Sequence, residues 1–217
     1  MSGQLPVSPP VAATAVVFDL GGVLIDWDPR YLYRRLFGGD DTAMEHFLAT
    51  VCTQDWNAEQ DAGRPWATAV ETLAQQHPGQ RHLIRAYRER WAEMLGGPIH
   101  GTLAILDELR AADMPLYALT NWSAETFPVA RERYDFLGWF GGIVVSGQER
   151  IRKPDERIFH ILLDRHRLVA EQTVYIDDVS ANVTVAAGLG LRALRFSSAE
   201  QLRADLAQLG LLATVPA

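Results

Sequence analysis

The sequence predicts an α/β fold in which a parallel sheet, with helices on both faces, carries an inserted all-helical region. From residue 99 onward, short β-rich runs alternate with helical periodicity, which implies parallel strands joined by right-handed crossovers. Between residues 28 and 98 the periodicity is helical, and no run there is as good a strand candidate as residues 15–19.

The composition is that of a soluble globular protein. The chain has 217 residues, of which 48% are hydrophobic and 22% are charged, so disorder is excluded as its main state. A net charge of −7 at pH 7 argues against a nucleic-acid partner. The longest apolar run, residues 11–25, is interrupted by Asp19 and two glycines, which excludes a membrane span. The single cysteine, Cys52, suits a reducing compartment, and we expect a cytoplasmic protein whose oligomeric state stays open.

The elements follow one another in a clear order. Residues 1–14 contain three prolines and no Lys or Arg, and they predict a flexible tail. A buried strand at 15–19 ends at two glycines, and a helix begins at Asp28 and Pro29, a favourable N-cap and first position. Further helical segments are separated by breaks at 38–39, 61–64 and 78–79, and Gly96-Gly97-Pro98 closes the region like a hinge.

Four more strands and the helices between them complete the chain. The predicted strands span 115–120, 142–146, 173–177 and 191–196. Helices precede the first of these strands, follow Ser123, include Ile158 to Leu162, and begin at Ser180 and Ser198.

Polar side chains occur where the predicted strands end, and in a parallel sheet these ends meet at one edge, where ligands bind. They are Asp19, Thr120, Asn121, Asp177 and Asp178, with Lys153 on a loop that follows another strand.

Three carboxylates at one edge need cations beside them, because two such charges at close range repel by about 4 kcal/mol at an effective dielectric constant of 20. Lys153 offers one positive charge, and an oxygen-seeking Mg²⁺ ion would offer two more. A magnesium ion beside an aspartate, a hydroxyl and a lysine suits a transferring phosphoryl group. Asp19 would attack phosphorus and form an aspartyl-phosphate that water hydrolyses.

Four motifs, in order, resemble those of the haloacid dehalogenase-like hydrolase superfamily. They are Phe18-Asp19-Leu20-Gly21-Gly22-Val23-Leu24, Thr120-Asn121, Lys153-Pro154, and Asp177-Asp178 with Asn182. The resemblance covers nearly the whole chain after the tail. It implies a Rossmann-like catalytic core formed by residues 15–27 and 99–217, with residues 28–98 as a small helical cap domain.

The resemblance also implies catalytic and substrate-binding roles. Asp19 would be the nucleophile, and Lys153 would steady both the nucleophile and the phosphate. Thr120, with Asn121 beside it, would bind the phosphoryl oxygens of a small phosphorylated substrate.

Mg²⁺ is the implied cofactor. Asp19 and Asp178 would be direct ligands, Asp177 would lie close by or act through water, and the backbone carbonyl of Gly21 would also reach the ion. Phosphatases of the superfamily usually carry a second aspartate at the position of Gly21, as general acid and base. A bacterial subgroup that acts on sugar phosphates, including α-glucose 1-phosphate, also has Asp-Leu-Gly here, and Asp26 is a nearby candidate for the missing acid.

Three further residues are candidates for substrate contacts. Trp56 and Arg64 flank the helix–helix turn where the superfamily has its specificity loop, and Trp122 follows the phosphate-binding pair. Trp56 is equally compatible with the core of the cap, and Arg64 with the surface. The six histidines have no metal-ligand spacing.

The leading hypothesis is therefore a Mg²⁺-dependent phosphatase acting on a small phosphorylated metabolite such as a sugar phosphate. One alternative is a metal-independent 2-haloacid dehalogenase that uses the same Asp19 nucleophile, although Asp177 and Asp178 would repel a carboxylate substrate. Another alternative is a catalytically weak phosphate-binding protein, which the glycine at position 21 favours.

Overall fold

A computed structural model describes residues 12–213. Most of the predicted flexible tail, residues 1–14, lies outside this range. The described residues form a five-stranded sheet in which every neighbouring pair is parallel, and this confirms the predicted α/β class. In spatial order the strands are β5 (Gly142–Val145), β4 (Leu116–Thr120), β1 (Ala15–Phe18), β6 (Thr173–Asp177) and β7 (Arg192–Arg195).

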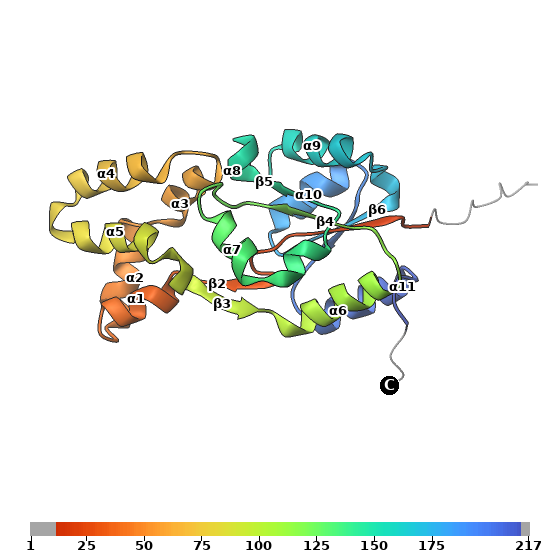
Figure 1. The fold of residues 1–217 in the computed structure, drawn as a ribbon, viewed down its shortest axis with the longest axis horizontal. Coiled ribbons are helices and arrows are strands. Elements are labelled where there is room, and N and C mark those ends of the chain that lie inside the picture. Colours follow the sequence, from red (N-terminus) through yellow and green to blue (C-terminus); the bar gives the residue numbers. More distant parts are fainter. Residues whose placement is uncertain (1–11, 214–217) are drawn as a thin grey trace, which may run out of the picture.

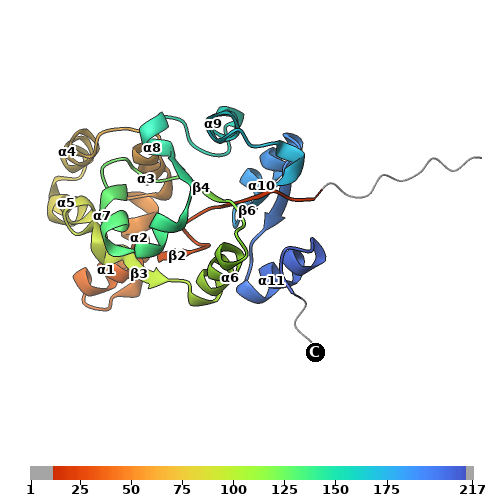
Figure 2. The same ribbon diagram turned by 45° about the vertical axis from the view of Figure 1, so that its right-hand side comes forward.

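Both faces of the sheet are covered, and its central strands β1 and β6 are therefore buried along their whole length. Along β1, Val16 and Phe18 belong to one apolar cluster, whereas Val17 belongs to another, as the alternation of side chains along a strand requires. The first cluster includes residues of α6 (His100–Ala111) and α11 (Ala199–Gln208), and the second includes residues of α9 (Glu156–His166) and α10 (Ser180–Gly188). The two pairs of helices lie on opposite sides of the sheet (Figure 1 and Figure 2).

Of the six α-helices between β1 and β4, the first five gather at one end of the molecule, beside the sheet (Figure 1). They are α1 (Arg30–Leu36), α2 (Asp41–Thr50), α3 (Gln54–Asp61), α4 (Trp66–Gln76) and α5 (Arg81–Glu89). The break between α2 and α3 was not predicted. It occurs at Thr53, whose hydroxyl accepts the backbone N–H of Trp56 at 3.0 Å and so caps the new helix.

A short antiparallel ribbon connects these helices to the sheet, and it was also not predicted. It consists of β2 (Ile25–Trp27) and β3 (Leu95–Pro98), where the chain enters and leaves the helical region. The second strand contains two glycines and a proline, so it has no alternating apolar pattern by which it could be recognised. The segment expected to act as a hinge is thus part of a paired ribbon.

Two shorter helices complete the fold, α7 (Phe127–Arg133) and α8 (Ser146–Glu149). The helix expected to follow Ser123 begins four residues later, at Phe127. Ser198 caps α11 as predicted, because its hydroxyl accepts the backbone N–H of Gln201 at 3.1 Å. Within residues 12–213, no helix has the length and apolar character needed to cross a membrane.

Candidate active site

Three neighbouring strands deliver polar side chains to one edge of the sheet. Asp19 follows β1, Thr120 ends β4 and Asp177 ends β6. Because β1 lies between β4 and β6, the three residues are adjacent although they are far apart in sequence. Asp19 is 7% exposed, and Thr120 and Asp177 are almost completely buried.

Lys153 holds the centre of this edge. Its Nζ donates to Oδ2 of Asp19 at 2.9 Å, to Oδ2 of Asp177 at 2.6 Å and to the carbonyl of Leu119 at 2.9 Å. Burial by itself would lower the pKa of Lys153, but the charges of Asp19 and Asp177 raise it above its ordinary value. The buried ammonium therefore stays charged and fixes the position of both carboxylates.

The carboxylate of Asp177 accepts hydrogen bonds from several donors of the protein. It accepts the Tyr175 hydroxyl, the backbone N–H of Val179 at 2.8 Å and the Asn182 amide at 3.0 and 3.1 Å, besides Lys153. Burial acts to raise the pKa of Asp177, but Lys153 lowers it overall. The hydrogen bonds indicate that Asp177 positions Lys153, and the roles of Asp19 and Asp178 as direct metal ligands stay predictions.

The three aspartates form a group that could hold a cation. Asp19, Asp177 and Asp178 each offer one carboxylate oxygen, and these oxygens all lie within 4.8 Å of one another. Burial raises the pKa of Asp19 to about 7 against the opposing effect of Lys153. Three acids beside one lysine are short of positive charge, and hard carboxylate oxygens are the donors that Mg²⁺ prefers. The donor set fits magnesium.

The two glycines after Asp19 differ in whether the structure could accommodate a side chain in their place. Gly22 has a φ of +74°, and a Cβ there would lie 2.6 Å from Oδ2 of Asp178, so both its conformation and its neighbour exclude a side chain. A Cβ at Gly21 would meet no atom of the described residues within 4 Å. Gly21 is therefore open to substitution, whereas Gly22 lets Asp178 approach the first loop.

Thr120 and Asn121 differ in what their side chains do. The Oγ1 of Thr120 is buried and has no hydrogen-bond partner within residues 12–213, so it is available to a bound anion. The amide of Asn121 is already used, because it accepts the backbone N–H of Lys153 at 2.8 Å and donates to the Lys153 carbonyl at 3.0 Å. The side chain of Asn121 thus holds the lysine loop, and its contact with the phosphoryl group stays a prediction.

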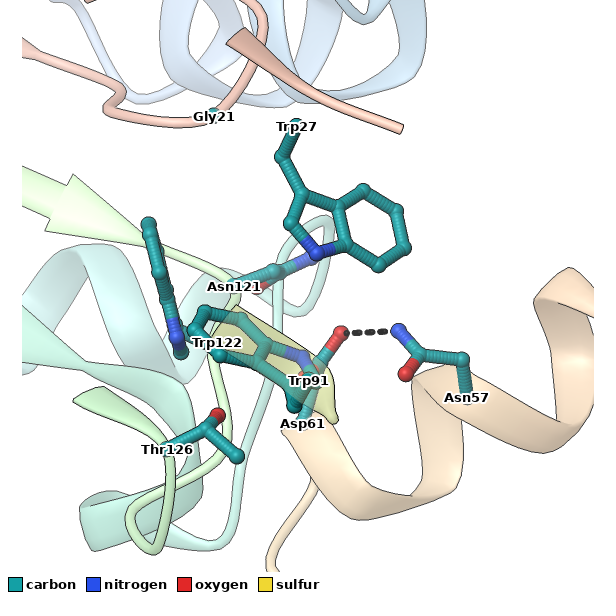
Figure 3. Close-up of a pocket in the computed structure, with 8 residues that line it drawn as sticks. All are labelled: Gly21, Trp27, Asn57, Asp61, Trp91, Asn121, Trp122 and Thr126. Atoms are coloured by element: carbon teal, nitrogen blue, oxygen red, sulfur yellow. Dashed lines mark hydrogen bonds between the residues drawn. The ribbon is translucent and has the colours of Figure 1, made fainter. Parts of the chain in front are cut away.

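A pocket with a volume of about 80 Å³ adjoins this edge. Its wall comes partly from the sheet loops and partly from the helical region (Figure 3). The eight lining residues are Gly21, Trp27, Asn57, Asp61, Trp91, Asn121, Trp122 and Thr126. Trp122 was expected there from the sequence.

Two predicted substrate contacts do not line this pocket. Trp56 packs inside the helical region, with ring centroids 5.6 Å from Trp66 and 5.2 Å from Tyr87. Arg64 donates to the side chain of Gln60 at 2.6 Å and to the Trp56 carbonyl at 3.2 Å, and it pairs with Glu59. Trp56 is a core residue and Arg64 bonds to the end of α3, and their roles as substrate contacts stay predictions.

Five lining residues were not recognised as site residues from the sequence. They are Trp27, Asn57, Asp61, Trp91 and Thr126. Only Asp61 had a signal, since it begins the turn expected to carry the specificity loop. The indole nitrogens of Trp27 and Trp122 and the hydroxyl of Thr126 are buried without a hydrogen-bond partner among residues 12–213. The pocket wall thus contains three hydrogen-bond donors that have no partner within the described residues.

Comparisons with known proteins agree with this geometry. The chain is 24% identical to sesquiterpene phosphatase astK of Aspergillus oryzae, over 90% of this chain and 95% of that protein. It is 26% identical to the GMP/IMP nucleotidase YrfG of Escherichia coli, over 80% of this chain and 81% of that protein.

A solved structure shares the fold. A HAD-family enzyme from Bacteroides thetaiotaomicron, in complex with magnesium and inorganic phosphate, superimposes with a TM-score of 0.64 at 20% identity. The match covers 86% of this chain and 96% of that one. A family profile described as haloacid dehalogenase-like hydrolase matches residues 13–190. The chain therefore belongs to the haloacid dehalogenase-like hydrolases.

Proposed function

We propose that this hydrolase is a Mg²⁺-dependent phosphatase of small phosphorylated metabolites, with a sugar phosphate as substrate. One observation carries the proposal: Oδ2 of Asp19 lies 2.9 Å from the ammonium of Lys153, at the edge where Thr120 presents a hydroxyl without a partner among the described residues. A nucleophile and a free donor on adjacent strand ends, with a cation from a neighbouring loop, are what transfer of a phosphoryl group to an aspartate requires.

In the proposed reaction the carboxylate of Asp19 attacks phosphorus and forms an aspartyl-phosphate while the alcohol leaves. Water then attacks phosphorus and restores the free carboxylate. Lys153, held by Asp177 at 2.6 Å, favours the ionised form of Asp19 and orients it, and Thr120 donates to a phosphoryl oxygen. Asp19, Asp178 and the carbonyl of Gly21 would hold Mg²⁺, which supplies positive charge beside the phosphoryl oxygens.

The pocket beside Gly21 supports a polar leaving group. Three tryptophans offer flat apolar faces, and the unsatisfied donors of Trp27, Trp122 and Thr126 would bind hydroxyl oxygens. A sugar has both kinds of surface, because its ring carries C–H groups on its faces and hydroxyls around its rim. A pocket of this kind also fits the general composition of ligand sites, apolar walls with a few placed polar groups.

The reaction class is further supported by the relatives, whose names describe a sesquiterpene phosphatase and a nucleotidase. We assign residues 28–98 to the cap domain and residues 15–27 with 99–217 to the catalytic core. Of the pocket wall, Asn57, Asp61 and Trp91 come from the assigned cap.

The test measures phosphate release from p-nitrophenyl phosphate and from a panel of sugar phosphates, with Mg²⁺ and with a chelator. Asp19→Asn is compared with Asp113→Asn, which removes the same charge at an exposed turn where φ is 54°. Asparagine tolerates this conformation, so the control variant should fold.

We expect turnover that depends on Mg²⁺, is lost in Asp19→Asn and is unchanged in Asp113→Asn. Chloride release from 2-chloropropionate that persists with the chelator would instead indicate a dehalogenase. Inactivity of the folded wild-type protein toward both kinds of substrate would reject the phosphatase and favour a binding protein.

A further inference from the structure

The position where phosphatases of this family usually have a general acid is empty of any side chain. Gly21 lies two residues after Asp19 and lines the pocket beside the active site. Because a Cβ at Gly21 would meet nothing within 4 Å among the described residues, packing does not explain the missing side chain. An alcohol leaving from phosphorus still needs a proton, which another group must supply.

Asp61 is the only titratable side chain among the eight residues that line this pocket. It is the last residue of α3 and lies across the pocket from Gly21 (Figure 3). Its Oδ2 accepts the amide of Asn57, one turn earlier on the same helix, at 3.2 Å. The main chain at Asp61 is also fixed, because its carbonyl accepts the hydroxyl of Ser146 at 2.5 Å. The carboxyl group is therefore held in place at the pocket wall.

The surroundings of Asp61 favour a carboxyl that carries a proton near neutral pH. Burial raises the pKa of Asp61 to about 7, against the opposing effects of a hydrogen bond from the backbone of Ser123 and the charge of Arg152. Tyr87 on α5 interacts electrostatically with Asp61 and has a pKa well above the ordinary value, chiefly because of its own burial, so that phenol stays neutral. An acid with a pKa close to the working pH can both donate and accept a proton.

Asp26, the acid suggested by the sequence, is placed differently. Its carboxylate accepts the hydroxyl of Tyr31 at 2.5 Å, and it lies on the β2–β3 ribbon against Gly96. It is not among the pocket-lining residues. The geometry therefore favours Asp61 over Asp26.

We propose that Asp61, supplied by the cap, is the general acid and base of the reaction and replaces the side chain absent at Gly21. This inference rests on the proposed phosphatase function. As Asp19 forms its bond to phosphorus and the bond to the leaving oxygen breaks, the Asp61 carboxyl gives its proton to that oxygen. The Asp61 carboxylate then takes a proton from the water that attacks phosphorus, which releases phosphate and restores both carboxyl groups to their starting states.

The experiment compares a good and a poor leaving group in the same active site. Asp61→Asn removes the proton but keeps an oxygen that can accept the backbone N–H of Ser123. Asp55→Asn is the matched control, because it removes an exposed carboxylate from the same helix. The kcat values are measured with p-nitrophenyl phosphate, whose leaving group needs little protonation, and with phenyl phosphate, whose leaving group needs more. Thermal unfolding checks that each variant folds.

We expect Asp61→Asn to lower kcat on phenyl phosphate by about 10²–10⁴-fold, the usual contribution of a general acid, and to affect p-nitrophenyl phosphate far less. In the wild-type protein, kcat on phenyl phosphate should fall as the pH rises through the pKa of Asp61, because the acid must be protonated, and this limb should be missing in the variant. Adding Gly21→Asp to Asp61→Asn should restore turnover of phenyl phosphate.

Other outcomes overturn the inference. An equal loss of kcat on both substrates would mean that Asp61 only helps to hold the cap against the core. No loss of kcat would mean that another group supplies the proton. Either result leaves the phosphatase standing, since the wild-type protein is still active. A folded wild-type protein without Mg²⁺-dependent activity on either ester would instead reject the proposed function and this role together.

Discussion

Lys153 and Asp177 form a completely buried ion pair, with 2.6 Å between the ammonium nitrogen and Oδ2. The same ammonium also contacts Asp19, the residue that follows β1 at this edge of the sheet. Breaking a buried pair by removing one partner leaves an uncompensated charge, which costs far more than the pair contributes when intact. Asp177 and its neighbour Asp178 should therefore respond very differently to truncation.

Asp177→Ala should lower the free energy of unfolding by about 3–5 kcal/mol, because it leaves the Lys153 ammonium without its closest partner. Asp178→Ala should change it by less than about 1 kcal/mol in a chelating buffer, since burial and the charge of Asp177 raise the pKa of Asp178 and disfavour its ionised form. Urea unfolding of both variants measures the difference. Similar losses would contradict the assignment of Asp177 as the positioning residue.

Magnesium should stabilise the wild-type protein against heat and should not stabilise Asp178→Ala. Binding to the folded state alone contributes about 2.7 kcal/mol when the free ion is at 100 times its Kd, so the melting temperature should rise with Mg²⁺ concentration. Asp113→Asn serves as the control and should respond as the wild-type protein does. A full magnesium response in Asp178→Ala would remove that residue from the ligand set.

The two glycines of the first loop should tolerate substitution unequally. Gly22→Ala should destabilise the protein by about 1–3 kcal/mol, because φ is +74° and the new methyl group would press on Asp178. Gly21→Ala should stay within about 1 kcal/mol of the wild-type value. Gly21→Asp should keep its response to Mg²⁺, since the backbone carbonyl is unchanged, and loss of that response would contradict the carbonyl as a ligand.

The hydroxyl of Thr120 should matter for catalysis and little for stability. Thr120→Val keeps the shape of the side chain and removes its donor, and it should lower kcat by about 10²–10³-fold, as loss of an oxyanion donor does elsewhere. Thr120→Ser retains the donor and should keep most of the activity. The comparison uses p-nitrophenyl phosphate at saturating concentration. Equal activities of the two variants would show that the hydroxyl does not bind the phosphoryl group.

The strands and their polar ends could be predicted because each signal is local. The run at 173–177 is apolar, is bounded by turns and ends in an aspartate, and it forms β6 with the same bounds. The ribbon of β2 and β3 could not be predicted this way, since its three- and four-residue strands are stabilised by pairing with each other. The two strands are far apart in the chain, so neither one alone shows the pattern of a strand.

The pocket beside the active-site edge was harder to predict because the residues that line it depend on how the helices are oriented. Trp56 and Asp61 lie five residues apart on α3, yet one packs against Trp66 and Tyr87 while the other lines the pocket. Which side of a helix turns inward depends on the whole arrangement of its neighbours. In the same way, the sequence does not reveal that the amide of Asn121 is already bonded to the main chain of Lys153.

Asp19, Thr120, Lys153 and Asp177 all belong to the sheet and its loops, whereas Asn57, Asp61 and Trp91 reach the pocket from the inserted helices. On the proposed mechanism, the nucleophile comes from the first stretch of the chain and the proton donor Asp61 from the second, so both stretches must meet for turnover. Asn57 and Trp91 can be substituted without touching the nucleophile, whereas Asp61 has to be kept. During evolution, a lineage built on this plan would reach new metabolites by changing the insertion around one fixed carboxylate.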